Sequence, residues 1–308
     1  MENPADRIRR GTLFPIVETF GFPHDSTTPE AIDARRHEHC PFAETTCEKK
    51  RQYGYGYCSV VYSAQWDAGT PRTYAVCDHR LDGEPLRWAI NDHFGNENAH
   101  LVPEVTATSS PKLNVDYVAY REDPSAEADV DLIAIETQAI DLRGGGVGPA
   151  WKAWEDGRTS EWRKYFTDEA LRKGRKDRID YGVNIGNVYK RLGTQVAIKG
   201  EYLKQVNVPL YVITQHAILV QLRSRVNFRP VASGDDWDIT FASFDYLGSV
   251  ESDGRLSFGF VEVMRTTLEE YRTALMSSRE TTIAAREEFV ARVRRKASKS
   301  TRDHEIPN

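Results

Sequence analysis

Hydrophobic and polar positions along the chain repeat with two periods, which predict a mixture of strands and helices. The segments 113–120 and 130–140 are rich in Val, Ile, Leu and Tyr, and the second is apolar enough to be a buried strand. Further strands are expected at 208–214, near 237–247 and at 255–263. The alternation of strands with helical segments favours an α/β fold around a central sheet.

Helical spacing is clearest between residues 183 and 204. Apolar residues approximate a stripe along this segment: Val183, Val188, Leu192, Val196 and Leu203. Polar residues are expected on its other faces: Asn184, Asn187, Lys190, Arg191 and Lys199. Asn and Arg can read base edges and Lys contacts phosphate, so these five side chains are candidate DNA contacts. Helices are also expected over 217–226 and from about 266 to 296, and the tail after 299 is expected to be disordered.

The four cysteines of the chain are concentrated in one short segment of 38 residues. They are Cys40, Cys47, Cys58 and Cys77. Four thiolates can hold Zn²⁺ or a rubredoxin-like iron in a tetrahedral site. Two strands, 58–62 and 73–77, flank a Gly-Thr-Pro turn and would place the last two cysteines side by side. The cluster therefore predicts one structural metal ion.

The cysteine cluster also permits arrangements other than four thiolates on one ion. The intervals of six, ten and eighteen residues differ from the paired C-x₂-C of most zinc ribbons. Buried free thiols are the simplest alternative, and disulfides are disfavoured in a cytoplasmic chain. His37 and His39 lie beside Cys40 and could replace one thiolate.

Acidic residues inside the two predicted strands are the candidate chemistry. Asp116 lies in the first strand, and Glu136 and Gln138 share one face of the second. An antiparallel hairpin would bring Asp116 to the same edge, where two carboxylates could bind Mg²⁺ and Gln138 could orient a water molecule. Glu104 is a further candidate acid. The alternative is a structural sheet with acids scattered at its strand ends.

Charge changes this interpretation, because the formal net charge of −5 by itself argues against a nucleic-acid partner. Residues 1–157 carry 15 basic and 26 acidic side chains, and residues 230–308 carry 11 and 14. Residues 158–229, in contrast, carry 15 basic and 6 acidic side chains, a net of +9. The basic side chains of this block could contact DNA phosphates. The alternative interpretation is that they form the solvent-exposed face of a helix.

These residues together resemble a known family. An Asp on one strand followed by Glu-x-Gln on the next resembles the PD-(D/E)xK nuclease signature, in which Gln replaces Lys in some restriction enzymes. The chain is similar to the NotI and EagI group of type II restriction endonucleases in ordered patches spanning residues 40–200. These patches are Cys40-Pro-Phe, Tyr57-Cys-Ser-Val, Cys77-x-x-Arg80-Leu, Ile-Glu136-Thr-Gln138-Ala-Ile-Asp141, Tyr181-Gly-Val-Asn184-x-x-Asn187-Val-x-Lys190-Arg191-Leu, Gln195 and Lys199-Gly200.

The resemblance implies a fold, a domain organisation and a set of cofactors. It implies a PD-(D/E)xK core, a mixed central sheet flanked by helices, over residues 86–308, with an N-terminal four-cysteine metal-binding subdomain over 1–85. It maps catalytic positions onto Asp116, Glu136, Gln138 and Glu104, with Mg²⁺ held by the first two. It maps a structural iron, with zinc as the alternative, onto the four cysteines. The chain departs from the family at Asp78, where proline is usual, and at the glycine-rich stretch 144–148.

The leading hypothesis is a type II restriction endonuclease. It would act as a homodimer that hydrolyses phosphodiester bonds in double-stranded DNA at a short, GC-rich palindrome. One alternative is a metal-stapled, sequence-specific DNA-binding protein without catalysis, and another is a repair nuclease of the same fold.

Several other classes of protein are disfavoured by the sequence. No apolar run approaches the roughly 18–20 residues that span a bilayer, and the polar start lacks a signal peptide's apolar stretch. We therefore expect a cytoplasmic protein with no membrane partner. The glycines at 144–148 lack the Lys-Ser/Thr of a phosphate-binding loop, so no nucleotide cofactor is expected.

Overall fold

The computed structural model contains two larger sheets, of which the central one has six strands. It describes residues 13–64, 69–95, 99–109, 112–122, 130–144, 146–175, 179, 181–232, 234–277 and 286–297. The central sheet has the strand order β14-β13-β12-β9-β8-β7. Its strands are β7 (His100–Ser109), β8 (Lys112–Glu122), β9 (Val130–Gln138), β12 (Leu210–Gln215), β13 (Ile239–Val250) and β14 (Leu256–Thr266).

The central sheet is mixed, as the resemblance implies. β12 runs parallel to both β9 and β13, whereas the pairs β7–β8, β8–β9 and β13–β14 are antiparallel. Every residue of β12 is buried, which is consistent with the apolar run at 210–213, and its last two residues, Thr214 and Gln215, are buried polar side chains. The predicted hairpin of the two acidic strands is confirmed, with Tyr117 opposite Ile135 and Val118 opposite Ala134.

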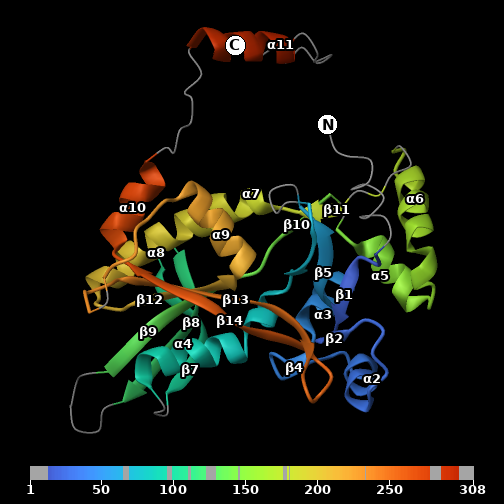
Figure 1. Cartoon of the computed structure of the whole chain (residues 1–308), viewed down its shortest axis with the longest axis horizontal. Coiled ribbons are helices and arrows are strands. Elements are labelled where there is room, and N and C mark those ends of the chain that lie inside the picture. Colours follow the sequence, from blue (N-terminus) through green and yellow to red (C-terminus); the bar gives the residue numbers. More distant parts are fainter. Residues whose placement is uncertain are drawn as a thin grey trace.

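Helices cover both faces of the central sheet (Figure 1). On one face lie α8 (Thr194–Gln205), α9 (His216–Arg225) and α10 (Leu268–Met276), which pack on the face of Ala134 and Val212. On the other face lies α4 (Glu84–Phe94), which packs on the face of Ile133, Ile135 and Tyr211. Because strand side chains alternate, the side chain of residue 136 faces the same layer as that of residue 134, toward α8.

The N-terminal part forms a four-stranded antiparallel sheet in the order β2-β1-β5-β6. Its strands are β1 (Ile16–Thr19), β2 (Phe22–Pro23), β5 (Tyr57–Ser63) and β6 (Pro71–Ala75). Beside them are α2 (Pro29–Arg36), the short hairpin of β3 (His39–Cys40) and β4 (Thr45–Thr46), and α3 (Glu48–Tyr53). The β5–β6 pairing confirms the predicted hairpin between Cys58 and Cys77.

Shorter elements connect the two sheets. The 3₁₀-helix η2 (Asp78–Leu81) follows Cys77, and β10 (Leu142–Gly144) pairs with β11 (Tyr181–Val183). Between them lie α5 (Gly148–Glu155), η3 (Thr159–Glu161) and α6 (Trp162–Arg172). A short helix α7 (Ile185–Asn187) and a π-helical turn η4 (Val188–Gly193) lead into α8.

The apolar core continues across the predicted domain boundary at residue 85. One cluster of buried side chains contains Ile16 and Tyr62 from the N-terminal sheet together with Val196 and Tyr271 from the helices of the central sheet. The core therefore does not divide at that boundary.

Two predicted helices differ from the structure. The helix expected from 183 begins later, because residues 181–183 pair with β10 as β11. The segment 266–296 contains α10 and α11 (Arg286–Ala297), and residues 278–285 between them lie outside the described part. The tail after residue 299 also lies outside it. Within the described ranges, no helix has the length and apolar character needed to cross a membrane.

Candidate active site

Two carboxylates from adjacent strands lie together on the α8 side of the central sheet. The backbone N–H of Asp116 on β8 donates to Glu136 Oε1 at 3.3 Å. The backbone N–H of Thr137 on β9 donates to Asp116 Oδ2 at 3.0 Å. The antiparallel pairing thus ties each carboxylate to the opposite strand. The prediction that the hairpin brings Asp116 and Glu136 to one place is confirmed.

The pair lies where burial disfavours negative charge. Glu136 is 6% exposed, and burial, with a smaller contribution from Asp116, raises its pKa to about 7. Burial also raises the pKa of Asp116, against the opposing effect of its hydrogen bond from Thr137. Two like charges in a site of low polarity attract a cation, and the fold provides one.

That cation is the ammonium of Lys199. Its Nζ lies 2.5 Å from Glu136 Oε2, and the residue is 6% exposed. The prediction that Lys199 lies on an outer face of its helix is wrong. On α8 it shares the buried face with Val196 and Leu203, at spacings of three and four residues. This spacing was visible in the sequence and could have identified Lys199 as buried.

The other two predicted catalytic side chains lie differently. Gln138 is half-buried at the end of β9, and its Nε2 donates to the carbonyl of Ala139 at 2.6 Å. Glu104 on β7 is exposed, with a left-handed φ of 52°. The flanking pairs of Pro103 with Tyr117 and Val105 with Val115 place it across from Asp116 on the sheet. It does not join the buried pair in this conformation.

Two further acids near the site were missed by sequence reasoning. Asp78 Oδ1 accepts a hydrogen bond from the backbone N–H of Ala139 at 2.9 Å, directly after Gln138. Asp82 accepts from the Tyr117 hydroxyl at 3.0 Å. After burial, the charges of Asp78 and Asp82 also act to raise the pKa of Asp116. The only sequence signal was the unusual acid after Cys77.

The cysteine cluster adjoins this acidic loop through Cys77. All four cysteines are free thiols, and Cys40, Cys47 and Cys58 are buried. Cys58 Sγ accepts a hydrogen bond from the backbone N–H of Gly21 at 3.2 Å. The backbone N–H groups of Phe42 and Ala43 act to lower the pKa of Cys40, and that of His79 acts in the same way on Cys77, against the larger effect of burial.

The thiols influence one another. Burial raises the pKa of Cys58 well above its ordinary value, and Cys77 and Cys40 raise it further. Burial raises the pKa of Cys77 to about 12, with Cys40 among the smaller contributions. Burial likewise raises the pKa of Cys40, and Cys47 adds to the effect. Each of the four cysteines is thus close enough to another for their charges to interact.

Neither the carboxylates at Glu136 nor the four cysteines form a complete set of metal ligands in the described part of the chain. Among the residues with described positions, no three His, Cys, Asp or Glu side chains converge tightly enough to hold a metal ion by themselves. At the acidic site, two protein carboxylates are enough for Mg²⁺, which usually completes its shell with water and substrate phosphate.

Three of the candidate DNA contacts lie around Asp141, just beyond the end of β9. Asn187 Nδ2 donates to Asp141 Oδ2 at 2.9 Å, and Arg191 reaches the same oxygen at 3.3 Å. The backbone N–H of Asn184 donates to the Asp141 carbonyl at 2.7 Å. Lys190 is exposed. Asn184, Asn187, Lys190 and Arg191 lie within or just before the π-helical turn η4. Such turns are often found at functional sites.

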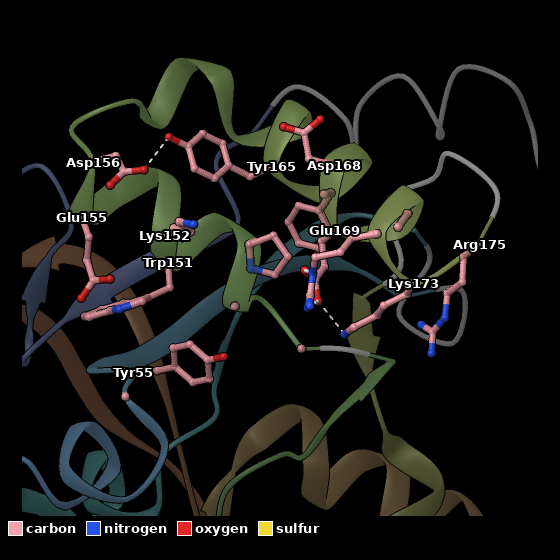
Figure 2. A pocket seen from close by; sticks show the side chains of 17 residues that line it. Tyr55, Trp151, Lys152, Glu155, Asp156, Tyr165, Asp168, Glu169, Lys173 and Arg175 are labelled. Atoms are coloured by element: carbon pink, nitrogen blue, oxygen red, sulfur yellow. Dashed lines mark hydrogen bonds and ion pairs between the residues drawn. The ribbon is translucent and has the colours of Figure 1, made fainter.

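A cavity of about 640 Å³ lies elsewhere, between α5, α6 and the loop after α3. Figure 2 shows Tyr55 and Trp151 on one side of it and Asp168, Glu169 and Lys173 on the other. Among its charged side chains, Glu169 forms ion pairs with Arg172 and Lys173, and Asp156 accepts a hydrogen bond from the Tyr165 hydroxyl. Asp116 and Glu136 do not line it.

Comparison with known proteins adds no relative from which a function could be transferred. No model of a known protein family matches the chain, and no curated protein matches it significantly.

Proposed function

We propose that this chain is a Mg²⁺-dependent deoxyribonuclease of the type II restriction class, acting on double-stranded DNA. The observation that carries the proposal is the pair formed by the buried Glu136 and the half-buried Asp116 on adjacent strands, each tied to the other strand by a backbone hydrogen bond. Placing two carboxylates together where water is largely excluded is unfavourable unless they are paired with a cationic group or coordinate a metal ion. The ordered resemblance of residues 40–200 to the NotI and EagI group supports the same interpretation.

The residues fit Mg²⁺, a hard ion that prefers oxygen ligands. Asp116 and Glu136 would hold it, each offering carboxylate oxygens on the same layer of the sheet. When bound, Mg²⁺ polarises a phosphodiester and lowers the pKa of a coordinated water. The chain's own part is positional: Thr137 N–H fixes Asp116, and the Gln138 amide, at the strand end, can orient water once it leaves the Ala139 carbonyl.

The four cysteines are proposed to hold one structural iron, with zinc as the alternative. The backbone N–H···S hydrogen bond from Gly21 to Cys58 supports this assignment, because such a donor stabilises a thiolate, and backbone N–H groups also act to lower the pKa of Cys40 and Cys77. The raised pKa values of Cys58 and Cys77 mean that metal binding must release protons. In the neighbouring loop, Asp78 joins the cluster to the end of β9.

DNA is proposed to lie across the surface around Asn184, Asn187, Lys190 and Arg191. These side chains flank the catalytic strand through Asp141, and the basic block 158–229 surrounds them in sequence. A homodimer would present two such surfaces to a short GC-rich palindrome, matching its two-fold symmetry.

Incubating supercoiled plasmid with the purified protein and Mg²⁺ tests the nuclease proposal. We expect discrete fragments whose sequenced ends share one palindrome, and no cleavage by Glu136→Ala or in excess chelator. Lys204→Met is a matched control, because Lys204 lies on α8 but is exposed and pairs with Asp238. Absence of cutting by the wild-type protein, or equal cutting by Glu136→Ala, contradicts the proposal. Cutting without sequence preference would instead indicate a repair nuclease.

A second function, DNA binding without catalysis, is favoured by one observation. Glu136 already has a partner for each oxygen, in Lys199 and in the backbone of Asp116, so the acids could be purely structural. Sequence-specific binding that needs no Mg²⁺, without nicking, would support this alternative.

A further inference from the structure

Lys199 is buried beside the two carboxylates because of the way α8 packs on the central sheet. It comes from α8, in the helical layer, and approaches a strand pair that it follows by more than sixty residues in the chain. On β9 itself, the residue two positions after Glu136, which shares its face, is the neutral Gln138. The positive charge at the two carboxylates is therefore supplied by the helix and not by the strand.

The helix α8 packs closely against α10 at the residue next to Lys199. Gly200, next to Lys199, faces Leu268 at the start of α10, and a Cβ at position 200 would lie 2.9 Å from Leu268 Cδ1. Val196 and Leu203, above and below, are buried in the same core. A side chain at position 200 would require Leu268 or the helices to shift, so the glycine permits the observed packing of α8, the helix that carries Lys199, against α10.

A buried ion pair of this kind is weak evidence for stability alone. Desolvating the two groups offsets much of their attraction, and an apolar pair of similar size would serve the core as well. Here the ammonium contacts one of two carboxylates that also lie beside each other. Its charge compensates one negative charge and leaves the second for another cation.

We propose that Lys199 is a positioning residue for catalysis, which holds Glu136 through Oε2 and offsets its charge so that Asp116 and Glu136 can together receive a divalent cation. This inference rests on the proposed nuclease function. It also replaces the role expected from sequence: Lys199 acts inside the active site and does not contact the DNA backbone as a surface lysine.

The test separates the rate of cleavage from the affinity for DNA. Lys199→Met removes the charge and keeps an unbranched apolar side chain, and Lys199→Arg keeps the charge. Lys190→Met is the control for an exposed, DNA-facing lysine, and Lys204→Met is the control for a surface lysine on α8. DNA binding is measured with Ca²⁺ in place of Mg²⁺ over a range of salt, and single-turnover cleavage is started by adding Mg²⁺ to the preformed complex.

For Lys199→Met we expect the cleavage rate constant to fall by about 100-fold, the usual order for loss of one preorganised polar group. The DNA dissociation constant and its salt dependence should stay unchanged, and Lys199→Arg should recover part of the rate. Lys190→Met should instead weaken binding and reduce the salt slope by about one. Thermal denaturation of each variant establishes that the folded protein is being compared.

Three results would overturn the inference. A weaker, less salt-dependent DNA affinity for Lys199→Met with an unchanged rate would make Lys199 a phosphate contact. A lower melting temperature with an unchanged rate, or no recovery by Lys199→Arg, would make its role structural. Failure of the wild-type protein to cleave any DNA is a separate result, which rejects the proposed function and this inference with it.

Discussion

At the scale of single residues, the site is governed by the free energy of burying charge. Asp116 and Glu136 would repel each other if both were ionised, and burial strengthens that repulsion. Lys199 and the backbone N–H groups of Asp116 and Thr137 compensate only part of it. The two carboxylates are consequently held in an arrangement that a divalent cation would relieve.

This arrangement makes the stability of the protein without Mg²⁺ depend on pH. The pKa of Glu136 is about 7 in the folded chain, above its ordinary value of 4.5. The folded state therefore binds more protons between those values, and its extra stability is full below about 4.5 and is lost as pH rises through about 7. Added Mg²⁺ competes with the proton, so it should raise the melting temperature more at about pH 8 than at about pH 6.

Thermal denaturation with and without Mg²⁺ across this pH range measures the effect. Glu136→Gln, which cannot ionise, should flatten both the pH dependence and the response to Mg²⁺. A wild-type response to Mg²⁺ that is equal at both pH values would contradict the assignment of Glu136 as a ligand.

At the scale of elements, the separation between α8 and α10 sets the geometry of the site. Gly200 on α8 faces Leu268 at the start of α10, and a Cβ at position 200 would lie 2.9 Å from the Leu268 Cδ1 methyl. The same helix carries Lys199 on its buried face. A small change in the position of α8 therefore moves the ammonium relative to β9.

Gly200→Val tests this coupling between packing and the site. We expect the free energy of unfolding to fall by about 1–3 kcal/mol, the usual penalty for an overpacked core, together with slower cleavage. Chemical denaturation and single-turnover cleavage measure the two effects. Gly234→Val is a control in which the added side chain meets no neighbouring atoms. Because Gly234 has a positive φ, this variant reports backbone strain without overpacking. Unchanged stability and rate in Gly200→Val would show that the helices do not depend on this contact.

The loop after β6 is the second element that reaches the site. It carries Cys77 and then Asp78, which accepts the hydrogen bond of the Ala139 N–H at the end of β9. Cys77 is thus connected, through its neighbour Asp78 and one hydrogen bond, to the end of the strand that carries Glu136.

Replacing one cysteine tests the proposed metal and this connection. For Cys58→Ser we expect the iron content to fall from about one per chain to none, with a lower melting temperature, because four ligands close a structural site. Elemental analysis for iron and zinc, together with thermal denaturation, measures both. Absence of either metal from the wild-type protein purified without chelators would contradict the site.

At the scale of the whole molecule, a buried polar network joins the N-terminal sheet to the central sheet. Glu18 on β1 is fully buried and accepts hydrogen bonds from Arg80 at 3.2 Å and from the Tyr246 hydroxyl at 2.7 Å. The Arg80 guanidinium also lies over the rings of Phe42 and Phe258. Together with the continuous core, this network makes the two sheets one structural unit.

Arg80→Met should therefore destabilise the chain strongly. It leaves Glu18 buried without its charged partner, and we expect the free energy of unfolding to fall by about 3–5 kcal/mol. Arg272→Met is the matched control, because its pair with Glu201 is exposed and should change stability by less than about 1 kcal/mol. Chemical denaturation measures both variants, and similar values for the two would contradict the role assigned to Arg80.

Much of the fold could be predicted because its signals are local. The strands β8, β9 and β12 and the helix α9 follow from apolar periodicity within a few residues of the observed bounds. The adjacency of Asp116 and Glu136 was predictable because β8 and β9 form a hairpin. The alternation of side chains along each strand leaves few registers in which the apolar residues of both strands share a face. Asp78 could not be placed in the same way, since its contact with Ala139 spans 61 residues and depends on how two sheets meet.

The sequence by itself determined the central strands, the helices around them and the adjacency of the two acids proposed to be catalytic, because periodicity and hairpin geometry act over short distances. Only the tertiary structure decided what surrounds those acids. The burial that raises the pKa of Glu136, the ammonium of Lys199 and the carboxylates of Asp78 and Asp82 all arrive from other elements. Charge compensation in a core depends on which elements pack together, and that is a property of the folded chain.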